Sequence, residues 1–386
     1  MKILHILAYE KFLPHIIETS EAINPGQNRY ISCSAKGKTG YLPPPDISCR
    51  LQSGAFNLDM ESRWDIEWCD ALFLHPLSRS TSASVSAMTP GTVAVWCAMG
   101  GEYYKYSRQY QNSLYLPKTE KVMRELTSNR SVSKKIGDWF SKNIKSPLRS
   151  GQDPVSKVAG KIDFICALEN DPKPDFLKDF SAENIGEFPY YTFESALSSG
   201  AEPVDGEDIL IGNSAHRTNN HFDIIEQLRN VDLGGGRIVL PLSYGPADYA
   251  IEVDRFAKST FGEEKIVTLD KWLPISEYNR ILTRCGTVFM NHNRGQAMGN
   301  ICSMVMRGAR VYLRTENPYA EFLAKLGVTF EYISDNDFDG SILDPLPAAE
   351  KSSNRQIIID YWSRAAVEKR TAALFEKVGN NINKSQ

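Results

Sequence analysis

The sequence predicts an α/β protein with two doubly wound parallel sheets. Short apolar runs alternate with segments of helical periodicity in both halves of the chain, which is the pattern of repeated strand–helix units. The 386 residues are enough for two domains that each bury a core. A polar, turn-rich stretch at Gly200–Gly206 separates the halves and is typical of a linker.

Apolar runs bounded by turn residues are predicted to be strands. In the first half they lie at 2–7, 29–33, 71–74, 93–96 and 163–167. In the second half they lie at 209–211, 237–241, 266–269, 288–290 and 311–313. Helical or irregular connections follow these runs, so we expect parallel strands rather than hairpins. Apolar residues at near-helical spacing predict a last helix within 354–378.

Composition narrows the class of protein. The formal net charge is −3, so we expect no nucleic-acid partner. The seven cysteines are odd in number and include no Cys-x-x-Cys pair, which favours reduced thiols in the cytosol and no structural zinc. No apolar run is long enough to span a bilayer, and residues 1–7 are predicted to be a first strand rather than a signal sequence.

One basic stretch differs from the slightly negative net charge of the whole chain. Residues 118–149 contain nine basic and three acidic residues, a net charge of +6. Two interpretations remain open, an interfacial helix on anionic lipid and a surface helix that packs on its own domain. In a helix, Val132, Ile136, Trp139, Phe140 and Ile144 would share one face and Lys134, Lys135, Lys142 and Lys145 the other.

The strand at 208–211 runs directly into Gly212, Asn213 and Ser214, and a helix is predicted to start near Asn219 or Asn220. Gly212 permits a tight turn and close approach of the backbone to a ligand. Asn213 or Ser214 is then a candidate cap for the helix, whose free N–H groups would face an anion. This predicts a phosphate-binding loop, and the alternative is an ordinary strand-to-helix cap.

A second strand–loop–helix unit lies about eighty residues later. Strand 287–290 leads into a polar loop and then a helix over 297–306, so Arg294, Gln296, Gly299 and Asn300 are placed to contact a diphosphate. The turn after strand 309–313 brings Glu316 and Asn317 to a strand's carboxyl end, where a carboxylate can accept hydrogen bonds from ribose or sugar hydroxyls. Together the loops predict one nucleotide-sugar site.

Several of these segments have the sequence motifs of one enzyme family. The chain resembles the TDP-N-acetylfucosamine:lipid II N-acetylfucosaminyltransferases of enterobacterial common antigen synthesis and related O-antigen pathways. It departs from their pattern at Met99–Glu102 and at His216, where an acidic residue is common, so the exact sugar and acceptor stay open. The matching segments are Ile-Gly-Asn-Ser-x-x-Arg-x-Asn-x-His at 211–221, Val-Leu-Pro-Leu-Ser-Tyr-Gly at 239–245, Lys-Trp-Leu-Pro-Ile-Ser-Glu-Tyr at 271–278, Arg-Gly-Gln at 294–296, Glu-Asn-Pro at 316–318 and, more weakly, 93–103.

The resemblance implies a GT-B glycosyltransferase with two Rossmann-like domains and a cleft between them. Residues 1–203 would bind the acceptor and 204–351 the donor, with a terminal helix over 352–386 packing back on the first domain. The implied donor is a dTDP-linked dideoxyhexose such as Fuc4NAc, used for lipopolysaccharide or common antigen. The implied acceptor is an undecaprenyl-diphosphate-linked saccharide, which would place a peripheral enzyme on the cytoplasmic face of the bacterial inner membrane.

Sugar transfer leaves negative charge on a departing nucleoside diphosphate, and preorganised donors stabilise such charge. Arg217 and Arg294 are our candidates for this task, and we expect no metal and no cofactor. Aromatic rings at Tyr244 and Tyr249 could stack on the base or on a deoxysugar, with core packing as the alternative. His221 is expected to have at most a capping or supporting role.

An acceptor hydroxyl needs a base or a hydrogen-bonding partner when it attacks the anomeric carbon. Glu102 is our candidate base because it follows strand 93–96 and the pair Gly100-Gly101, and helix capping is the alternative. His75, at the end of another strand, is a second candidate for acceptor contact, although a hydrogen-bonded structural histidine is the favoured interpretation. Gly100 and Gly101 complete the predicted acceptor contacts.

Two other functions share the predicted nucleotide site. A sugar-nucleotide epimerase would interconvert the donor and form no new glycoside. A non-catalytic nucleotide-sugar-binding subunit of a polysaccharide assembly complex would bind the donor without transfer or hydrolysis.

Overall fold

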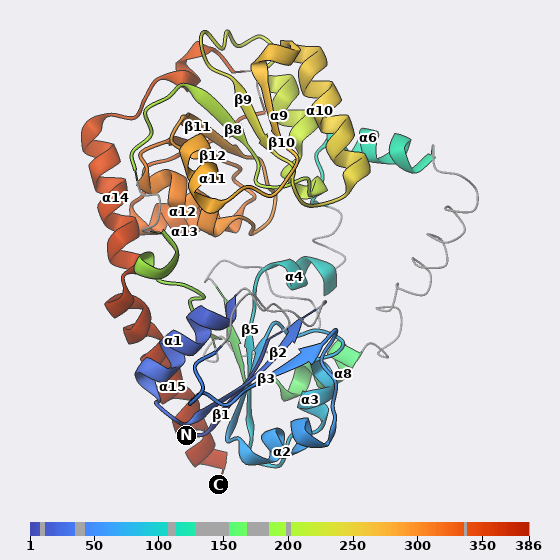
Figure 1. Ribbon diagram of the computed structural model, residues 1–386, viewed down its shortest axis with the longest axis vertical. Coiled ribbons are helices and arrows are strands. Elements are labelled where there is room, and N and C mark those ends of the chain that lie inside the picture. The colour runs from blue at the N-terminus through green and yellow to red at the C-terminus, as the bar shows by residue number, and fades with distance from the viewer. Residues whose placement is uncertain are drawn as a thin grey trace. The chain divides into compact units, whose positions relative to one another are not determined.

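The computed structural model describes residues 1–7, 12–34, 43–106, 113–128, 154–167, 185–197, 202–335 and 338–385. The chain divides into two compact units, each built around its own parallel sheet (Figure 1). Unit 1 contains Met1–Ser107, Ser146–Ala196 and Tyr361–Gln386, and unit 2 contains Arg108–Lys145 and Leu197–Asp360. The predicted α/β class with two doubly wound sheets is confirmed.

The sheet of unit 1 has the order β3-β2-β1-β4-β5-β6-β7, with every pair parallel. All residues of its central strands β1, β4 and β5 are buried, which explains their continuous apolar runs. The strands are β1 (Ile3–Leu7), β2 (Asn28–Ser34), β3 (Cys49–Ser53), β4 (Ala71–His75), β5 (Val93–Cys97), β6 (Phe164–Cys166) and β7 (Ile185–Gly186).

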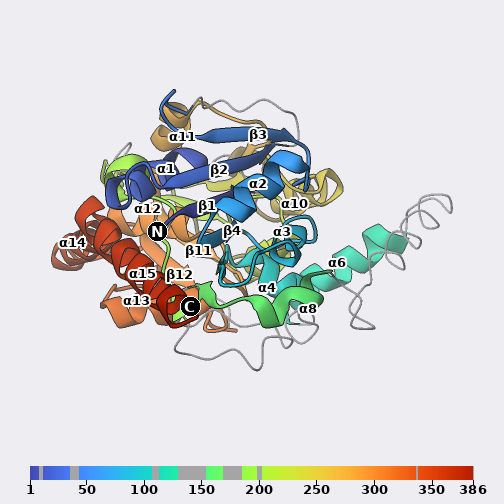
Figure 2. The ribbon, with the colours of Figure 1, turned by 90° about the horizontal axis from the view of Figure 1, so that it is seen from below.

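Helices α1 (Leu13–Ile23) and α15 (Arg364–Ser385) lie side by side in unit 1, as Figures 1 and 2 show. Their apolar residues join the strands in one core, where α15 contributes Leu374, Phe375 and Val378. A proline lies near the start of α1. The N–H groups of a first helical turn have no acceptor within the helix, so the missing N–H of proline costs no hydrogen bond there. The other helices are α2 (Met60–Trp68), α3 (Ser82–Ser86), α4 (Gly101–Tyr106), α8 (Pro154–Val158) and short turns at Ala159–Lys161 and Phe193–Leu197.

The sheet of unit 2 has the order β10-β9-β8-β11-β12-β13, again with every pair parallel. The chain winds outward from β8 to β10 and then returns to the other side of β8 at β11, so the strand order reverses between β8 and β11. Ligands of open α/β sheets bind at the carboxyl ends of the strands flanking such a reversal. The strands are β8 (Asp208–Ile211), β9 (Ile238–Pro241), β10 (Ile266–Leu269), β11 (Cys285–Met290), β12 (Arg310–Leu313) and β13 (Glu331–Tyr332).

The helices of unit 2 supply the rest of its core, in which Phe222, Tyr249 and Val253 pack against the strands. Helix α13 starts at a proline and ends before Gly327 in a left-handed conformation, the expected signals at both ends. The helices are α6 (Pro117–Ser128), α9 (His221–Gln227), α10 (Ala247–Phe261), α11 (Ile275–Leu282), α12 (Met298–Met306), α13 (Pro318–Leu326), α14 (Ala348–Trp362) and short turns at Arg217–Asn219, Glu263–Lys265 and Gly340–Leu343.

The predicted strands are all present, with shifts of a few residues at their ends. Strands β3, β7 and β13 were not predicted, because β3 is polar and half exposed and the others have two residues each. The division of the chain differs from the expected one in three ways, the first being that unit 2 begins at Leu197 rather than at 204. Residues 108–145 count with unit 2, and unit 1 takes back the chain at Tyr361 rather than at 352.

Candidate functional site

The loop after β8 is built around Gly212, whose φ of 70° lies in the left-handed region. A Cβ atom at this position would lie 2.6 Å from Oδ1 of Asn219 and 2.9 Å from Nε2 of His221. The N–H of Asn213 donates to the same Asn219 Oδ1 at 3.0 Å. Only glycine therefore lets the strand end fold against the polar residues that follow it.

The predicted cap of the next helix is wrong. Helix α9 begins at His221 and its N-cap is Asn220, at a φ of 49°. Ser214 is 1% exposed and its hydroxyl accepts from the side chain of Asn219 at 3.3 Å, so it shapes the loop. Asn220 turns its side chain toward residues 114–116 instead of an open anion site. The start of α9 is thus covered by protein.

Gln296 joins the loops after β8 and β11. Its Nε2 donates to Asn213 Oδ1 at 2.9 Å, and its Oε1 accepts from Thr218 Oγ1 at 2.6 Å and from Arg294 Nε at 2.8 Å. Asn213 Nδ2 in turn donates to the hydroxyl of Tyr244, in the loop after β9, at 3.0 Å. Predicted site residues from three loops are therefore brought into one hydrogen-bonded cluster at the reversal of the strand order.

Positive charge gathers at this cluster. Arg294 is held through its Nε, and Arg217 pairs with Asp248 at 3.4 Å. The pKa of His216 is lowered to about 4, by partial burial first and then by the charges of Arg294 and Arg217, so its ring is neutral at pH 7. At the position where the family often has an acidic residue, this chain has a neutral one beside two arginines. An anion at this cluster is therefore not repelled by residue 216, as it would be by a carboxylate.

Helix α12 starts at this edge. Its N-cap, Ala297, has a φ of 64°, which is strained for a residue with a Cβ, and its side chain caps nothing. Gly299 and Asn300 lie in the first turn and are half buried. The positive end of α12 stands in the same loop as Arg294 and can contribute N–H groups to an anion.

The turn after β12 holds Glu316 in a bidentate pair with Arg314, at 3.0 and 3.1 Å. Burial opposes ionisation of Glu316, but the hydrogen bonds and charge of Arg314 outweigh it, and the pKa of Glu316 is lowered. Its side chain is 49% exposed, so it can accept a further hydrogen bond. Asn317 is fully buried and caps α13 through Tyr319 N–H at 3.0 Å, a structural role in place of the predicted donor contact.

The two candidate tyrosines, Tyr249 and Tyr244, differ in their exposure to solvent. Tyr249 is 0% exposed, packs edge-to-face on Phe222 and hydrogen-bonds His221 at 3.3 Å, so its predicted stacking on a ligand is wrong. Tyr244 is 48% exposed and stacks on Trp272, which is 79% exposed, with ring centroids 6.0 Å apart. Trp272 was not predicted as a site residue, although its sequence segment was part of the resemblance.

In unit 1, Glu102 lies in the first turn of α4 and is 8% exposed. Its Oε1 accepts from Trp96 Nε1 at 3.3 Å and from the N–H of Met99 at 2.8 Å. Gly100, with a φ of 85°, makes the turn that allows this approach, and Gly101 starts the helix. These bonds are those of a capping residue, and the role of Glu102 as a base stays a prediction.

His75 is 1% exposed, and one of its ring nitrogens lies 3.1 Å from a ring nitrogen of His5. Its pKa is well below the usual value because of burial first and then the neighbouring His5. Phe188 packs edge-to-face on its ring, with centroids 5.2 Å apart. The favoured interpretation of His75, a buried and hydrogen-bonded histidine, agrees with this environment, and its predicted acceptor contact does not.

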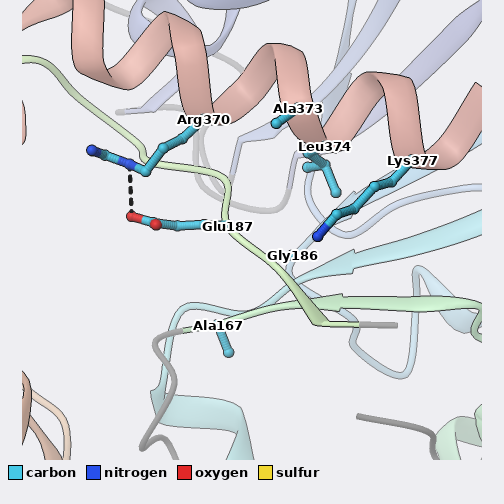
Figure 3. Close-up of a pocket in the computed structure, with 7 residues that line it drawn as sticks. All are labelled: Ala167, Gly186, Glu187, Arg370, Ala373, Leu374 and Lys377. Carbon is cyan, nitrogen blue, oxygen red and sulfur yellow. Dashed lines mark ion pairs between the residues drawn. The ribbon is translucent and has the colours of Figure 1, made fainter. Parts of the chain in front are cut away.

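A cavity of about 310 Å³ lies at the carboxyl ends of β6 and β7, beside α15 (Figure 3). Arg370 lines it but is paired with Glu187 at 3.2 Å, and its guanidinium stacks on Tyr361 at 4.0 Å. Its cation is therefore engaged within the fold. The lining residues are Ala167, Gly186, Glu187, Arg370, Ala373, Leu374 and Lys377.

Several features of these loops were not predicted. Asn219, Thr218 and His292 hold the loops after β8 and β11 together, and His292 Nε2 lies 2.8 Å from Asn219 Oδ1. A run of polar side chains between Gly212 and the next helix is the signal that could have found Thr218 and Asn219. Of the basic stretch 118–149, only residues up to Ser128 are described, so the predicted lipid-facing residues 132–144 lie outside the described residues.

Among the residues that the structure describes, no group of His, Cys, Asp or Glu is placed to hold a metal ion. The sequence does contain overlapping Asp-x-Asp patterns at 335–339, of which 336 and 337 lie outside the described ranges and Asp335 pairs with Arg314 at 3.3 Å. In the same described part of the chain, no helix has the length and apolar character to cross a bilayer. All seven cysteines carry free thiols.

Residues 188–357 match the family model described as 4-alpha-L-fucosyltransferase, glycosyl transferase group 56, which confirms the resemblance to fucosyl-type transferases. Anabaena HepE in complex with UDP and glucose has a similar structure, with a TM-score of 0.59, 11% identity and coverage of 97% of this chain and 99% of that chain. The lipopolysaccharide outer core galactosyltransferase WaaB has a TM-score of 0.55, 10% identity and coverage of 98% and 99%. A Listeria monocytogenes protein assigned as a UDP-N-acetylglucosamine 2-epimerase reaches 0.50, with 12% identity and coverage of 98% and 96%. The shared fold is the GT-B fold.

Proposed function

Because the chain is a glycosyltransferase with the GT-B fold, we propose that it transfers a dideoxyhexose or acetamido-dideoxyhexose, such as Fuc4NAc, from a dTDP-sugar. The acceptor is an undecaprenyl-diphosphate-linked saccharide of bacterial surface polysaccharide synthesis. One observation carries the donor site. The cluster of Asn213, Thr218, Arg294 and Gln296 joins two loops at the reversal of the strand order, beside Arg217 and the start of α12.

The chemistry follows from where charge develops. As the acceptor oxygen bonds to the anomeric carbon, the bond from that carbon to the β-phosphate oxygen breaks and the departing nucleoside diphosphate gains one further negative charge. Fixed positive groups stabilise that charge without reorganising. Gln296 fixes the guanidinium of Arg294 through its Nε. Arg217 and the first N–H groups of α12 act on the same diphosphate. We propose that no metal ion takes part in this step.

The stacked rings of Tyr244 and Trp272 provide a platform for the nucleobase. An exposed aromatic pair is unusual on a soluble surface unless a flat apolar partner covers it, and a pyrimidine base is such a partner. The hydroxyl of Tyr244 is tied to Asn213, so the platform and the phosphate loop are held in one arrangement. Glu102 stays our candidate base for the acceptor hydroxyl.

The decisive experiment combines a panel of dTDP- and UDP-sugars with an undecaprenyl-diphosphate-linked acceptor and identifies products by mass spectrometry. A new glycoside formed from one dTDP-sugar supports the proposal. Conversion of the donor sugar without a glycoside would indicate the epimerase, whose fold is shared. Donor binding with neither reaction would indicate the non-catalytic subunit.

Glu316→Gln should raise the donor KM about tenfold or more while the circular dichroism spectrum stays unchanged. The carboxylate is oriented by Arg314 and half exposed, and a charged acceptor strengthens a bond to a sugar or ribose hydroxyl by about 1.5–3 kcal/mol. Glu321→Gln, on exposed helix surface nearby, is the matched control. Normal donor kinetics in the Glu316 variant would make it a turn residue only.

We also propose that the basic stretch 118–149 brings the enzyme to the cytoplasmic leaflet, because its net charge of +6 suits an anionic surface. Binding to anionic vesicles should weaken steeply as salt rises, since ionic strength screens the attraction. The combined variant Lys134→Glu, Lys135→Glu and Trp139→Ser should lose vesicle binding and transfer to a lipid acceptor, but keep transfer to a short soluble acceptor. Equal loss on both acceptors would assign this stretch to the fold.

A further inference from the structure

The segment Ser113–Thr119 is encoded between β5 and β6 of the first sheet, yet it packs in unit 2. The chain leaves unit 1 after Ser107 and returns to it at Ser146. Helix α6, which begins inside this segment, contacts α9 and α10. The segment therefore lies next to the loops that we assign to the donor, although the sequence places it in the other half of the protein.

Asn220 connects this segment to both phosphate loops. Its Oδ1 accepts from the N–H of Leu116 at 3.0 Å, and its Nδ2 lies within 3.2 Å of the carbonyl of Leu114 and 3.0 Å of the carbonyl of Asn291. Asn291 returns a bond from its Nδ2 to the carbonyl of Asn220 at 3.1 Å. Because Asn220 is 0% exposed, it cannot touch a ligand and acts only through the loops.

Two further contacts hold the segment in place. The carboxylate of Asp223 accepts from the N–H groups of Lys118 at 2.9 Å and Thr119 at 3.0 Å, which satisfies the first turn of α6 from another helix. Asn293 Nδ2 donates to the carbonyl of Ser113 at 2.8 Å. Asn293 directly precedes Arg294, so this contact reaches the backbone of the loop that carries the main candidate cation.

We propose that Ser113–Thr119 is a positioning element of the nucleoside diphosphate site, with Asn220 and Asp223 as the positioning residues that dock it. This inference rests on the proposed function of the same site. Docking holds the loops after β8 and β11 in the arrangement that binds diphosphate. When the segment undocks, the competent fraction of the protein falls and the apparent Kd rises in inverse proportion. By linkage, a bound nucleotide must also stabilise the docked segment.

The test uses the full chain and calorimetric titration with dTDP and with UDP. Asn220→Gly keeps the left-handed backbone and removes the side-chain bonds, so it should weaken nucleotide binding about tenfold. Asp223→Asn retains the shape but loses one acceptor and should weaken binding less. The matched control is Glu252→Gln, which removes the 3.0 Å ion pair with Arg255 within α10 and touches neither the segment nor the loops. The control should bind as the unaltered protein does.

Hydrogen exchange separates positioning from general destabilisation. In the unaltered protein, saturating nucleotide should slow exchange of the amides of 114–128, and this protection should be lost in both docking variants. If Asn220→Gly does not fold, as judged by circular dichroism, Asp223→Asn gives the same decision. Unchanged Kd values in folded variants, or no protection of 114–128 by nucleotide, would overturn the inference. Failure of the unaltered protein to bind either nucleotide would instead overturn the proposed function, and this inference with it.

Discussion

Arg294→Ala should lower kcat/KM for sugar transfer about 10- to 100-fold and weaken binding of the free nucleoside diphosphate. The guanidinium is fixed by Gln296 at 2.8 Å, so its charge is already in place when the leaving group departs. Loss of a charge-assisted bond of about 1.5–3 kcal/mol corresponds to a factor of this size. Steady-state kinetics with the identified donor and calorimetry with its diphosphate measure both effects.

The same variant has a spectroscopic readout. The charge of Arg294 helps to hold the pKa of His216 at about 4, so its removal should let that pKa rise toward the usual value. A titration of the His216 ring by NMR would follow this change. Arg255→Ala, on the exposed surface of α10, is the control and should alter neither property. Unchanged kinetics and an unchanged His216 titration would remove Arg294 from the site.

Acidification from pH 7 to about pH 5 should lower the free energy of unfolding by several kcal/mol. His5, His75, His221 and His292 are each at most 1% exposed. Burial lowers the pKa of His5 and of His221 to about 3, and those of His75 and His292 well below the usual value. These rings stay neutral in the native protein, whereas the same rings in the unfolded chain take up protons below about pH 6.5.

The sign follows from proton counts. Between about pH 6.5 and pH 3 the unfolded state binds more protons, so the free energy of unfolding falls as the pH falls. His5 and His221, whose native pKa is about 3, each contribute about 1.4 kcal/mol per pH unit, together about 4 kcal/mol at pH 5, against a typical total of about 5–15 kcal/mol. His75 and His292 act in the same direction. Urea unfolding followed by circular dichroism from pH 8 to pH 5 measures the slope. A free energy of unfolding that stays constant over this range would contradict the burial of these neutral rings.

The fold and the turn at the centre of the proposed donor site could be predicted because their signals are local. A buried strand in a parallel sheet needs a continuous apolar run, so the buried strands could be located in the sequence as such runs. Gly212 was identifiable because a tight strand-to-loop turn needs a residue without a Cβ atom, and the structure shows that a Cβ would meet Asn219. Arg294 and Gln296 were placed by the rule that parallel strands end at one edge.

The wrong or missing assignments depend on contacts between segments far apart in the chain. Tyr249 and Tyr244 look alike in the sequence, and only the packing of α10 against the sheet buries one and exposes the other. The sequence at the start of α9 is typical of an anion site. In the structure, the side chain of Asn220 instead hydrogen-bonds the backbone of residues 114–116. Strand β3 was not predicted because a half-exposed strand has no continuous apolar run.

By itself, the sequence determined the α/β class, the positions of most strands along the chain and the glycine turn after β8, because propensity, glycine conformation and strand burial act within a few residues. Only the tertiary structure decided that Asn213, Gln296 and Tyr244 form one cluster, and that residues 108–145 belong with unit 2. Those outcomes rest on hydrogen bonds and burial between distant segments. Such contacts form only once the chain has brought its strands into register, and no local pattern encodes them.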